Sequence, residues 1–235
     1  MPRAGFAWPI LFQKKNESER YSMATANKPS LPVIKRLPRY YRYLGELAAN
    51  GVVKISSSEL ARMMGTTASQ VRQDFNCFGG FGQQGIGDNV NLLHEELGRL
   101  LFSKQAVPAI LIGAGNLGHT MANYFKQNSK GFDLVGAFDI QPELVGQSLC
   151  GLTTILDMSE LESFCQRVHP KVAVICVPRT AAKQIGGQLV ELGIRAFWNF
   201  SHYDFRIDFP GLIVENVHLG DSLATLSYEV NNAEL

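Results

Sequence analysis

The sequence predicts an α/β protein with a small helical part at the N-terminus and a doubly wound parallel sheet at the C-terminus. Through the first part of the chain, apolar residues recur at helical spacing. From Val107 onward, short β-branched runs alternate with helical stretches, and a glycine-rich turn follows the first run. Unbroken apolar strands separated by helices are typical of a parallel sheet that is covered on both faces.

The composition is that of a globular protein. The chain has 235 residues, of which 46% are hydrophobic and 18% charged, and this is enough for an ordinary core without disulfides. No apolar stretch reaches the roughly 20 residues that span a bilayer. The cysteines have neither CxxC nor Cys/His spacing, so we predict buried thiols of a cytoplasmic protein rather than metal ligands. They are Cys77, Cys150, Cys165 and Cys176, of which Cys77 stands in a different sequence context and is expected to be more exposed than the others.

Charge is divided unevenly along the chain. Residues 1–104 carry 14 Lys and Arg against 8 Asp and Glu, a balance of +6, whereas residues 105–235 carry 8 against 13, a balance of −5. A basic N-terminal part favours a polyanionic partner, with a random surface distribution as the alternative. Residues 1–27 precede the first helical pattern and are predicted to be a disordered tail or an extension from an upstream start.

Three helices are predicted in the N-terminal part. The first, at 32–49, has apolar residues at helical spacing and an Asn-Gly stop. After an extended run at 52–55, Ser57 caps a second helix that ends at Gly65, and either of the next two threonines caps a third at 68–78. A tight turn between the second and third helices is the layout of a helix-turn-helix.

Glycines follow at high density in residues 79–87, and this suits a tight β-hairpin. A hairpin after a helix-turn-helix is a wing, which the nearby Phe78 and Phe81 favour; the alternative is a flexible interdomain linker. Residues 89–103 are predicted to form an amphipathic connecting helix. We therefore expect a winged-helix DNA-binding domain with its linker helix over residues 28–104.

A G-x-G-x-x-G run follows the predicted strand at 107–112 and opens a predicted helix at 119–127. A dinucleotide-binding fingerprint requires that context. Its glycines permit a tight turn and a close approach of pyrophosphate, while the helix N-terminus offers amides to the phosphates. Residues 105–220 are thus predicted to form a Rossmann-type NAD(H)-binding domain, with a purely structural glycine turn as the alternative. The fingerprint residues are Gly113, Ala114, Gly115, Asn116, Leu117 and Gly118.

Further strands are predicted at 134–138, 172–177, 196–200 and 212–214. Their carboxyl ends share one edge of the sheet with the glycine turn, and ligands of open α/β sheets bind at that edge. Asp139 can accept hydrogen bonds from the adenosine ribose, and no Arg or Lys follows it to hold a 2′-phosphate, so NADH and NAD⁺ are favoured over NADP(H). Further cofactor contacts are predicted from Ile140, Val177, Pro178, Arg179, Asn199, Phe200 and Ser201, with ordinary loop chemistry as the alternative for the last six.

The residues do not predict an enzyme. Hydride transfer needs a substrate region and an acid or base near the nicotinamide, but the 117 residues after Gly118 are roughly what the nucleotide fold itself uses. His202 and His218 follow strands, yet neither has an identifiable substrate partner. The rival hypothesis is a small NAD-dependent oxidoreductase with an N-terminal interaction domain.

Several ordered motifs together resemble the Rex family of redox-sensing transcriptional repressors, and they extend over nearly the whole chain. They are QVRQDF at 70–75, FGGFG at 78–82, the glycine turn at 113–118, Phe138-Asp139, Val177-Pro178-Arg179, Asn199-Phe200 and VENV at 214–217. The resemblance implies a homodimer that represses transcription when NADH is scarce and leaves DNA when NADH binds. It also implies that the C-terminal helix, in residues 221–235, is swapped between the two subunits.

Two further cofactor contacts rest on the resemblance alone. Tyr124 matches a tyrosine near the nicotinamide, and His218 stands where one branch of the family has an Asp. In that branch the Asp pairs with an Arg at the position of Asn116, and the pair switches with the oxidation state of the cofactor. Because both residues differ here, such a pair cannot exist in this chain. A largely apolar nicotinamide pocket is expected to favour the uncharged ring of NADH, because burying an unpaired charge is costly.

The resemblance makes 68–78 the recognition helix of a protein that binds double-stranded DNA. Gln can read adenine, Arg can read guanine or hold a phosphate, and other basic residues fix the register. A dimer of this layout favours a pseudo-palindromic operator, and an uncharged wing suits an A·T-rich minor groove. The predicted contacts, each with solvated surface as its alternative, are Arg36, Arg39, Arg42, Lys54, Ser69, Gln70, Arg72, Gln73, Gln83 and Gln84.

Overall fold

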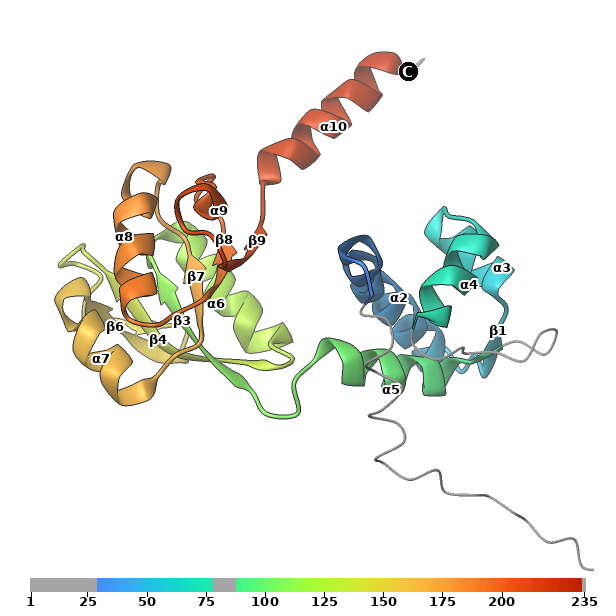
Figure 1. The fold of residues 1–235 in the computed structure, drawn as a ribbon, viewed down its shortest axis with the longest axis horizontal. Helices are drawn as coiled ribbons and strands as arrows, with labels where there is room; N and C mark the ends of the chain where they lie inside the picture. The colour runs from blue at the N-terminus through green and yellow to red at the C-terminus, as the bar shows by residue number, and fades with distance from the viewer. Residues whose placement is uncertain (1–28, 78–87, 234–235) are drawn as a thin grey trace, which may run out of the picture. The chain divides into compact units, whose positions relative to one another are not determined.

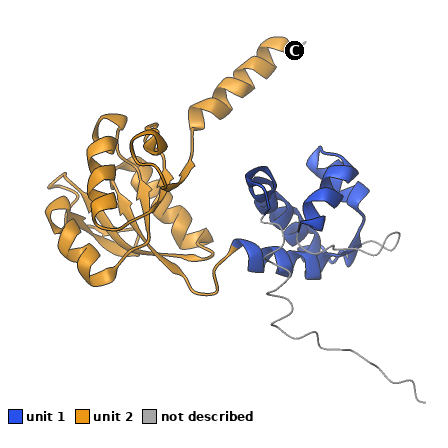
Figure 2. Ribbon diagram, viewed as in Figure 1, with its two compact units in different colours: residues 1–101 blue, residues 102–235 orange. Residues whose placement is uncertain are grey.

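The computed structural model describes residues 29–77 and 88–233 and divides the chain into two compact units, residues 1–101 and 102–235 (Figure 1, Figure 2). The predicted tail at 1–27 and the predicted wing at 79–87, with Gln83 and Gln84, lie outside the described residues.

Unit 1 is helical, as the periodicity predicted. A short antiparallel ladder pairs Lys54 with Asn89 and Ile55 with Asp88, on either side of the segment predicted to be the wing. Inward-facing residues of all the helices form one core around Tyr40 and Leu44, which are fully buried. The elements are α2 (Leu31–Ala49), β1 (Lys54–Ile55), α3 (Ser57–Met64), α4 (Ala68–Asn76), β2 (Asp88–Asn89) and α5 (Val90–Leu101).

The turn between α3 and α4 has defined caps at both sides. Gly65 ends α3 with φ +61, a left-handed conformation that suits glycine, and Thr67 caps α4 by accepting a hydrogen bond from the Gln70 amide. The N-cap of α3 is Ser56 and not Ser57. Ser56 and Glu59 form a capping box in which each side chain bonds the other residue's backbone amide. Ser57 was predicted because one serine in a run of three cannot be distinguished from the next by spacing.

Replacing Ser56 with alanine is expected to lower the free energy of unfolding by about 1 kcal/mol, because the side-chain half of the capping box is lost. Urea denaturation followed by circular dichroism measures the effect. Ser58→Ala, at an exposed position inside the same helix, is the control. Equal unfolding free energies for the two variants would contradict the assignment of the cap.

Unit 2 is a seven-stranded sheet in the order β5-β6-β4-β3-β7-β8-β9. All neighbours from β6 to β9 are parallel, and β5 is antiparallel at one edge. The strand order reverses at β3, and the crevice at such a reversal is where doubly wound folds bind nucleotides. The strands are β3 (Val107–Ile112), β4 (Phe132–Asp139), β5 (Ser148–Leu149), β6 (Thr153–Asp157), β7 (Val172–Ile175), β8 (Ala196–Asn199) and β9 (Ile213–Asn216).

Helices cover both faces of this sheet. Alternate residues of β3 point to opposite faces: Leu111 packs in the cluster that contains residues of α6 (Asn116–Asn128), whereas Ile112 packs with residues of α7 (Leu161–Val168) and α8 (Arg179–Glu191). A 3-10 turn (Met158–Glu160) leads into α7, and the short α9 (Phe205–Asp208) packs through Phe205 on the α8 face. The doubly wound α/β prediction is confirmed.

The C-terminal helix α10 (Leu219–Asn232) has no buried residue within its own chain, and Figure 1 shows it standing clear of the sheet. Leu219, Leu223, Leu226 and Val230 are 65%, 68%, 54% and 48% exposed. Their spacing places them on one side of the helix. An isolated helix of this length is marginal in water, so this apolar stripe needs a partner surface.

Several predicted boundaries are corrected. Strands β5 and β6 were not predicted, because β5 has only two residues and β6 begins with the polar Thr153 and Thr154. The helix after the glycine turn begins at Asn116 rather than at 119, since the extended Gly115 is its N-cap. The strand predicted at 172–177 ends at Ile175.

Candidate functional site

The glycine turn after β3 has little space for side chains at two of its three glycines. Gly113 has φ +94, and a Cβ built there would lie 2.7 Å from the Cys176 carbonyl oxygen. A Cβ on Gly118 would lie 2.1 Å from the Gly113 oxygen. At Gly115, by contrast, a Cβ would meet nothing within 4 Å. The protein's own packing therefore requires Gly113 and Gly118 but not Gly115, which leaves Gly115 open for a ligand.

Asp139 holds this turn from the end of β4. Its Oδ2 accepts a hydrogen bond of 2.6 Å from the Ala114 amide, and its Oδ1 accepts one of 2.9 Å from the Gln141 amide. The residue is only 7% exposed. Each carboxylate oxygen keeps a second lone pair, so the same side chain can hold the turn and accept a further donor. No side chain caps the N-terminus of α6, so its first amides can face a phosphate.

A pocket of about 260 Å³ lies where β3, β4 and β7 end. Its walls are mostly apolar, with Asp139 as its acidic group. The glycine cradle, the uncapped helix end and the acid together fit a dinucleotide. The lining residues are Ile112, Gly113, Gly115, Phe138, Asp139, Ile140, Gln141, Met158, Cys176, Val177, Pro178, Ala181 and Ile185.

Sequence reasoning missed several of these lining residues. Met158 follows β6, a strand that was not predicted, so its place at the sheet edge could not be seen. Ala181 and Ile185 are four residues apart on α8 and line the pocket together, a signal that a helix prediction for this segment would have revealed. Cys176 follows β7, and burial raises the pKa of its thiol to about 12.

The other residues of the predicted fingerprint do not line the pocket with their side chains. Ala114 is fully buried, and Leu117 packs against the core on the α6 face. Asn116 and Arg179 are exposed first residues of α6 and α8. A contact from Leu117 to a cofactor would be made by its backbone amide, whereas the Ala114 amide already donates to Asp139 Oδ2.

Asn199, Phe200 and Ser201 have a different arrangement from the one predicted. The fully buried Asn199 side chain donates to the Tyr203 carbonyl and to Asn216 Oδ1, and it accepts from the Ser201 amide and hydroxyl. Phe200 is 7% exposed and stacks edge-on against Trp198. Because these side chains are engaged with one another, they organise the ends of β8 and β9 rather than line the glycine-turn pocket.

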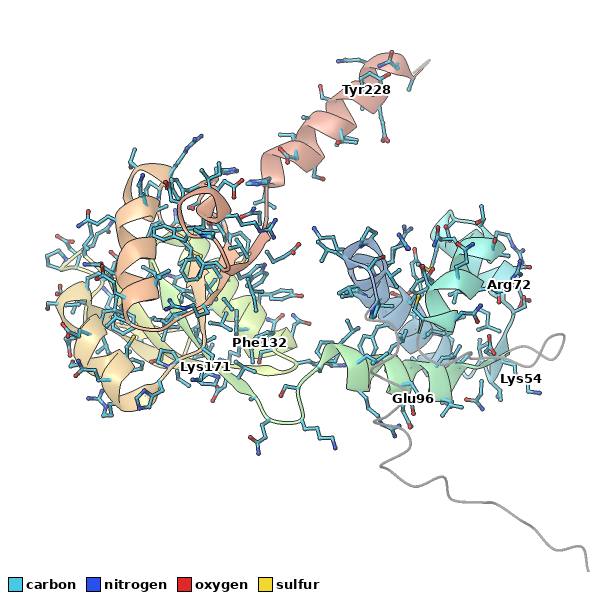
Figure 3. All side chains as sticks on the ribbon, in the orientation of Figure 1. Lys54, Arg72, Glu96, Phe132, Lys171 and Tyr228 are labelled. Carbon is cyan, nitrogen blue, oxygen red and sulfur yellow. The ribbon has the colours of Figure 1, made fainter. Side chains whose placement is uncertain are left out.

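Tyr124 lies elsewhere within its own subunit. It sits on the second half of α6, is 52% exposed, and lines an apolar groove of about 400 Å³ whose floor includes Trp198, with ring centroids 6.1 Å apart. The groove is lined by residues of β7, β8 and β9, and the half-exposed Phe132 also lines it (Figure 3). The predicted proximity of Tyr124 to the nicotinamide therefore does not follow from the geometry of one subunit.

His218 stands at the start of α10 and pairs with His202. Their Nδ1 atoms are 3.1 Å apart and the rings are nearly parallel. One ring must donate and the other accept, so the contact requires at least one neutral imidazole. His218 is the N-cap residue of α10, but its side chain makes no capping hydrogen bond.

In unit 1, two predicted DNA contacts have intramolecular partners. Arg36 donates from Nε and Nη2 to the two carboxylate oxygens of Asp74, each at 2.7 Å, and Gln70 Nε2 donates to the same carboxylate at 2.9 Å. Arg36 was predicted to contact a phosphate because sequence alone does not reveal a partner 38 residues away. In the structure the Arg36 side chain binds Asp74, and its contact with a phosphate stays a prediction.

The remaining predicted contacts within the described residues lie at the surface. Arg39 and Arg42 flank the Tyr43 ring, with guanidinium carbons 5.8 and 5.6 Å from its centroid. Figure 3 shows Arg72 on α4 and Lys54 on β1 with their side chains in solvent. The exposed candidates are Arg39, Arg42, Lys54, Ser69, Arg72 and Gln73.

A helix-turn-helix and a nucleotide-binding sheet in one chain define a DNA-binding regulator that responds to a nucleotide. Residues 29–76 match the family described as "Putative DNA-binding protein N-terminus", and residues 104–203 match the "CoA binding domain" family. The redox-sensing transcriptional repressor Rex of Thermoanaerobacter pseudethanolicus is 46% identical over 91% of this chain and 94% of its own. The redox-sensing transcriptional repressor Rex of Clostridioides difficile is 45% identical over 85% of this chain and 94% of its own.

Two solved structures give the same result. A crystal structure of RSP in complex with β-NADH has a TM-score of 0.79 and 43% identity, covering 87% of this chain and 95% of that one. A structure of RSP in complex with β-NAD⁺ and operator DNA has a TM-score of 0.79 and 46% identity, covering 87% and 94%. The chain belongs to the Rex family of redox-sensing transcriptional repressors. The relatives are named as repressors and not as enzymes.

Within residues 29–77 and 88–233, no helix is long and apolar enough to cross a membrane. No group of three or more His, Cys, Asp or Glu side chains there could hold a metal ion.

Proposed function

We propose that this chain binds operator DNA as a dimer when NADH is scarce and leaves the DNA when NADH occupies the pocket at the glycine turn. The observation that carries the proposal is the pocket itself, in which Gly115, the uncapped α6 and Asp139 converge, in one chain with a helix-turn-helix. Membership of the Rex family and the RSP structures with β-NADH, and with β-NAD⁺ and operator DNA, support it.

In this proposal the turn from Gly113 to Gly118 holds the pyrophosphate through backbone amides. Asp139 accepts from the adenosine ribose, and its charge disfavours a 2′-phosphate, so NADH and NAD⁺ are the ligands. Ile140 and Pro178 line the pocket and would pack against the adenine. Val177 lies beside Gly113, and the exposed Arg179 can reach a phosphate from the start of α8.

Redox discrimination is proposed to depend on an apolar environment for the nicotinamide. NADH supplies an uncharged ring, and an apolar environment favours it over the charged ring of NAD⁺. Asn116 and His218 replace the Arg–Asp pair of one family branch, so this chain has no such charged pair to switch. A neutral His218, paired with His202, is compatible with either form, whereas a protonated one would repel NAD⁺.

The dimer is proposed to form through α10. The apolar stripe of α10 is exposed among the residues that the structure describes, and the groove of about 400 Å³ beside α6 is lined by apolar residues such as Trp198 and Ile213. A swapped α10 from a second copy would cover such an apolar surface. It would also bring a partner's residues close to Tyr124, which is how Tyr124 could reach a nicotinamide.

Two copies of the helix-turn-helix then face a pseudo-palindromic, A·T-rich site. Ser69, Arg72 and Gln73 on α4 are the proposed base contacts, and Arg39, Arg42 and Lys54 the proposed phosphate contacts. Gln83 and Gln84 remain proposed minor-groove contacts. A repressor that reads operator DNA and the NADH pool works in the cytoplasm, and we propose no catalytic activity for it.

The test is fluorescence anisotropy with a labelled duplex that the wild-type protein enriches from a random-sequence pool. Titration with NADH is expected to weaken operator binding about 5- to 150-fold, the usual range for coupled sites, whereas NAD⁺ has a smaller effect. Operator DNA should weaken NADH binding by the same factor. Unchanged operator affinity at saturating NADH would rule the proposal out.

The rival function, a small oxidoreductase, is tested in parallel. The protein is incubated with NADH and a panel of aldehydes and keto acids while the absorbance of NADH is followed. Steady consumption of NADH would favour the enzyme. A constant signal together with NADH-sensitive DNA binding is the result expected here.

A further inference from the structure

Asp74 joins the recognition helix α4 to α2 through a buried network. Its side chain is 1% exposed, and it accepts hydrogen bonds from Arg36 Nε and Nη2, each at 2.7 Å, from the Tyr40 hydroxyl at 2.9 Å and from Gln70 Nε2 at 2.9 Å. Arg36 and Tyr40 belong to α2, and Gln70 lies one turn before Asp74 on α4. The planar fork of Arg36 permits only a narrow range of carboxylate orientations.

The charge of Asp74 is unfavourable for DNA binding by itself. Burial alone would raise the pKa of this carboxyl, but the hydrogen bonds from Arg36, Tyr40 and Gln70 and the Arg36 charge bring the pKa below its usual value. Asp74 is therefore ionised at neutral pH and opposes a polyanion. Its hydrogen bond and charge in turn raise the pKa of Arg36. The pair adds no net charge, so its contribution to DNA binding has to be geometric.

We propose that Arg36 and Asp74 are positioning residues for sequence recognition. Their bonds set the rotation of α4 about its axis, which decides where the exposed Arg72 and Gln73 point. The bond from Gln70 Nε2 to Asp74 orients the Gln70 amide, so that its carbonyl end rather than its amino end is available for contact with a base. This inference rests on the proposed function, since it assumes that α4 reads DNA.

Arg36→Lys separates this role from a phosphate contact. Lysine keeps the charge and binds phosphate well, but it cannot reproduce the two-pronged bond to Asp74. We expect operator affinity to fall about tenfold, the equivalent of one lost bond between charged groups. Affinity for a scrambled duplex and the slope of log K against log salt should stay as in the wild type, because no phosphate contact is lost. Arg62→Lys, an exposed arginine on α3, is the matched control.

Asp74→Asn distinguishes an effect of charge from an effect of positioning, because the two predict changes of operator affinity in opposite directions. If charge alone mattered, removing a carboxylate would strengthen binding to both duplexes, as Glu46→Gln on α2 is expected to do slightly. The positioning role predicts weaker operator binding. Where Asp74→Asn does not fold, as seen by circular dichroism, Tyr40→Phe keeps the ring and removes one bond, with a smaller loss of operator affinity expected.

A failure of the positioning role can be distinguished from a failure of the proposed function. If wild-type protein enriches no duplex from the pool, DNA binding itself is wrong. If wild type binds its operator and Arg36→Lys binds it equally well, the positioning role is wrong. A parallel loss of operator and scrambled-duplex affinity that follows the folded fraction would also overturn it, because it would indicate a role in stability only.

Discussion

Gly115→Ala is expected to weaken NADH binding roughly 5- to 150-fold while leaving the unfolding temperature unchanged. A Cβ at this position meets no protein atom within 4 Å, and the backbone there is ordinary extended structure with φ −70. The new methyl group would instead occupy the space in which a pyrophosphate must approach the α6 amides. Overlap of this kind costs about 1–3 kcal/mol, and that sets the expected range. Calorimetric titration with NADH measures it, and the variant should bind operator DNA but release it only at correspondingly higher NADH concentrations.

Gly118→Ala is the comparison that makes this result specific. Its Cβ would lie 2.1 Å from the backbone oxygen of Gly113, and backbone cannot move aside as a side chain can. Both the unfolding temperature and NADH binding should therefore fall. If Gly115→Ala binds NADH as tightly as the wild type, the pyrophosphate does not lie at this turn.

The double change Leu223→Asp and Leu226→Asp in α10 is expected to give a monomer that no longer holds its operator. Burying a leucine contributes about 1.5–3 kcal/mol, and an aspartate in an apolar groove adds an uncompensated buried charge. One half-site contact remains in the monomer, so operator affinity should approach that of non-specific DNA. Sedimentation equilibrium measures the mass, and anisotropy measures DNA binding.

Thr225→Asp is the control for this pair. Thr225 lies on the other side of α10 from the apolar stripe, and its hydroxyl bonds the Asp221 carbonyl. The substitution introduces a single aspartate on the side of α10 that faces away from the stripe, so it should leave the dimer intact. A dimer that persists in the double variant would show that α10 does not hold the two copies together.

The features that were predicted correctly are local in sequence. The glycine turn, the strand before it and the helix after it lie within a single stretch of chain, so their spacing alone indicates their structure. The same holds for the caps around Gly65 and Thr67, which depend on neighbours only a few residues away. Asp139 was predicted at the pocket because the carboxyl ends of parallel strands share an edge.

The features that were missed depend on tertiary contacts. Nothing near Arg36 in the sequence indicates that Asp74 will accept both of its donors. Asn199 donates to Tyr203 and Asn216, partners that its neighbours in the sequence do not indicate, and its contact with the cofactor stays a prediction. Tyr124 is eight residues beyond Asn116, and α6 carries it about 12 Å along its axis, away from the turn.

The raised pKa of Cys176 limits which chemistry this pocket can sense. Burial raises the pKa of this thiol to about 12, so at neutral pH the sulfur is almost wholly protonated, and a protonated thiol is a poor nucleophile. Thiolates are the nucleophiles that attack peroxides and disulfides. Oxidation of Cys176 is therefore expected to be slow, so we expect the pocket to respond to the state of a diffusible metabolite rather than to chemical damage to its own sulfur.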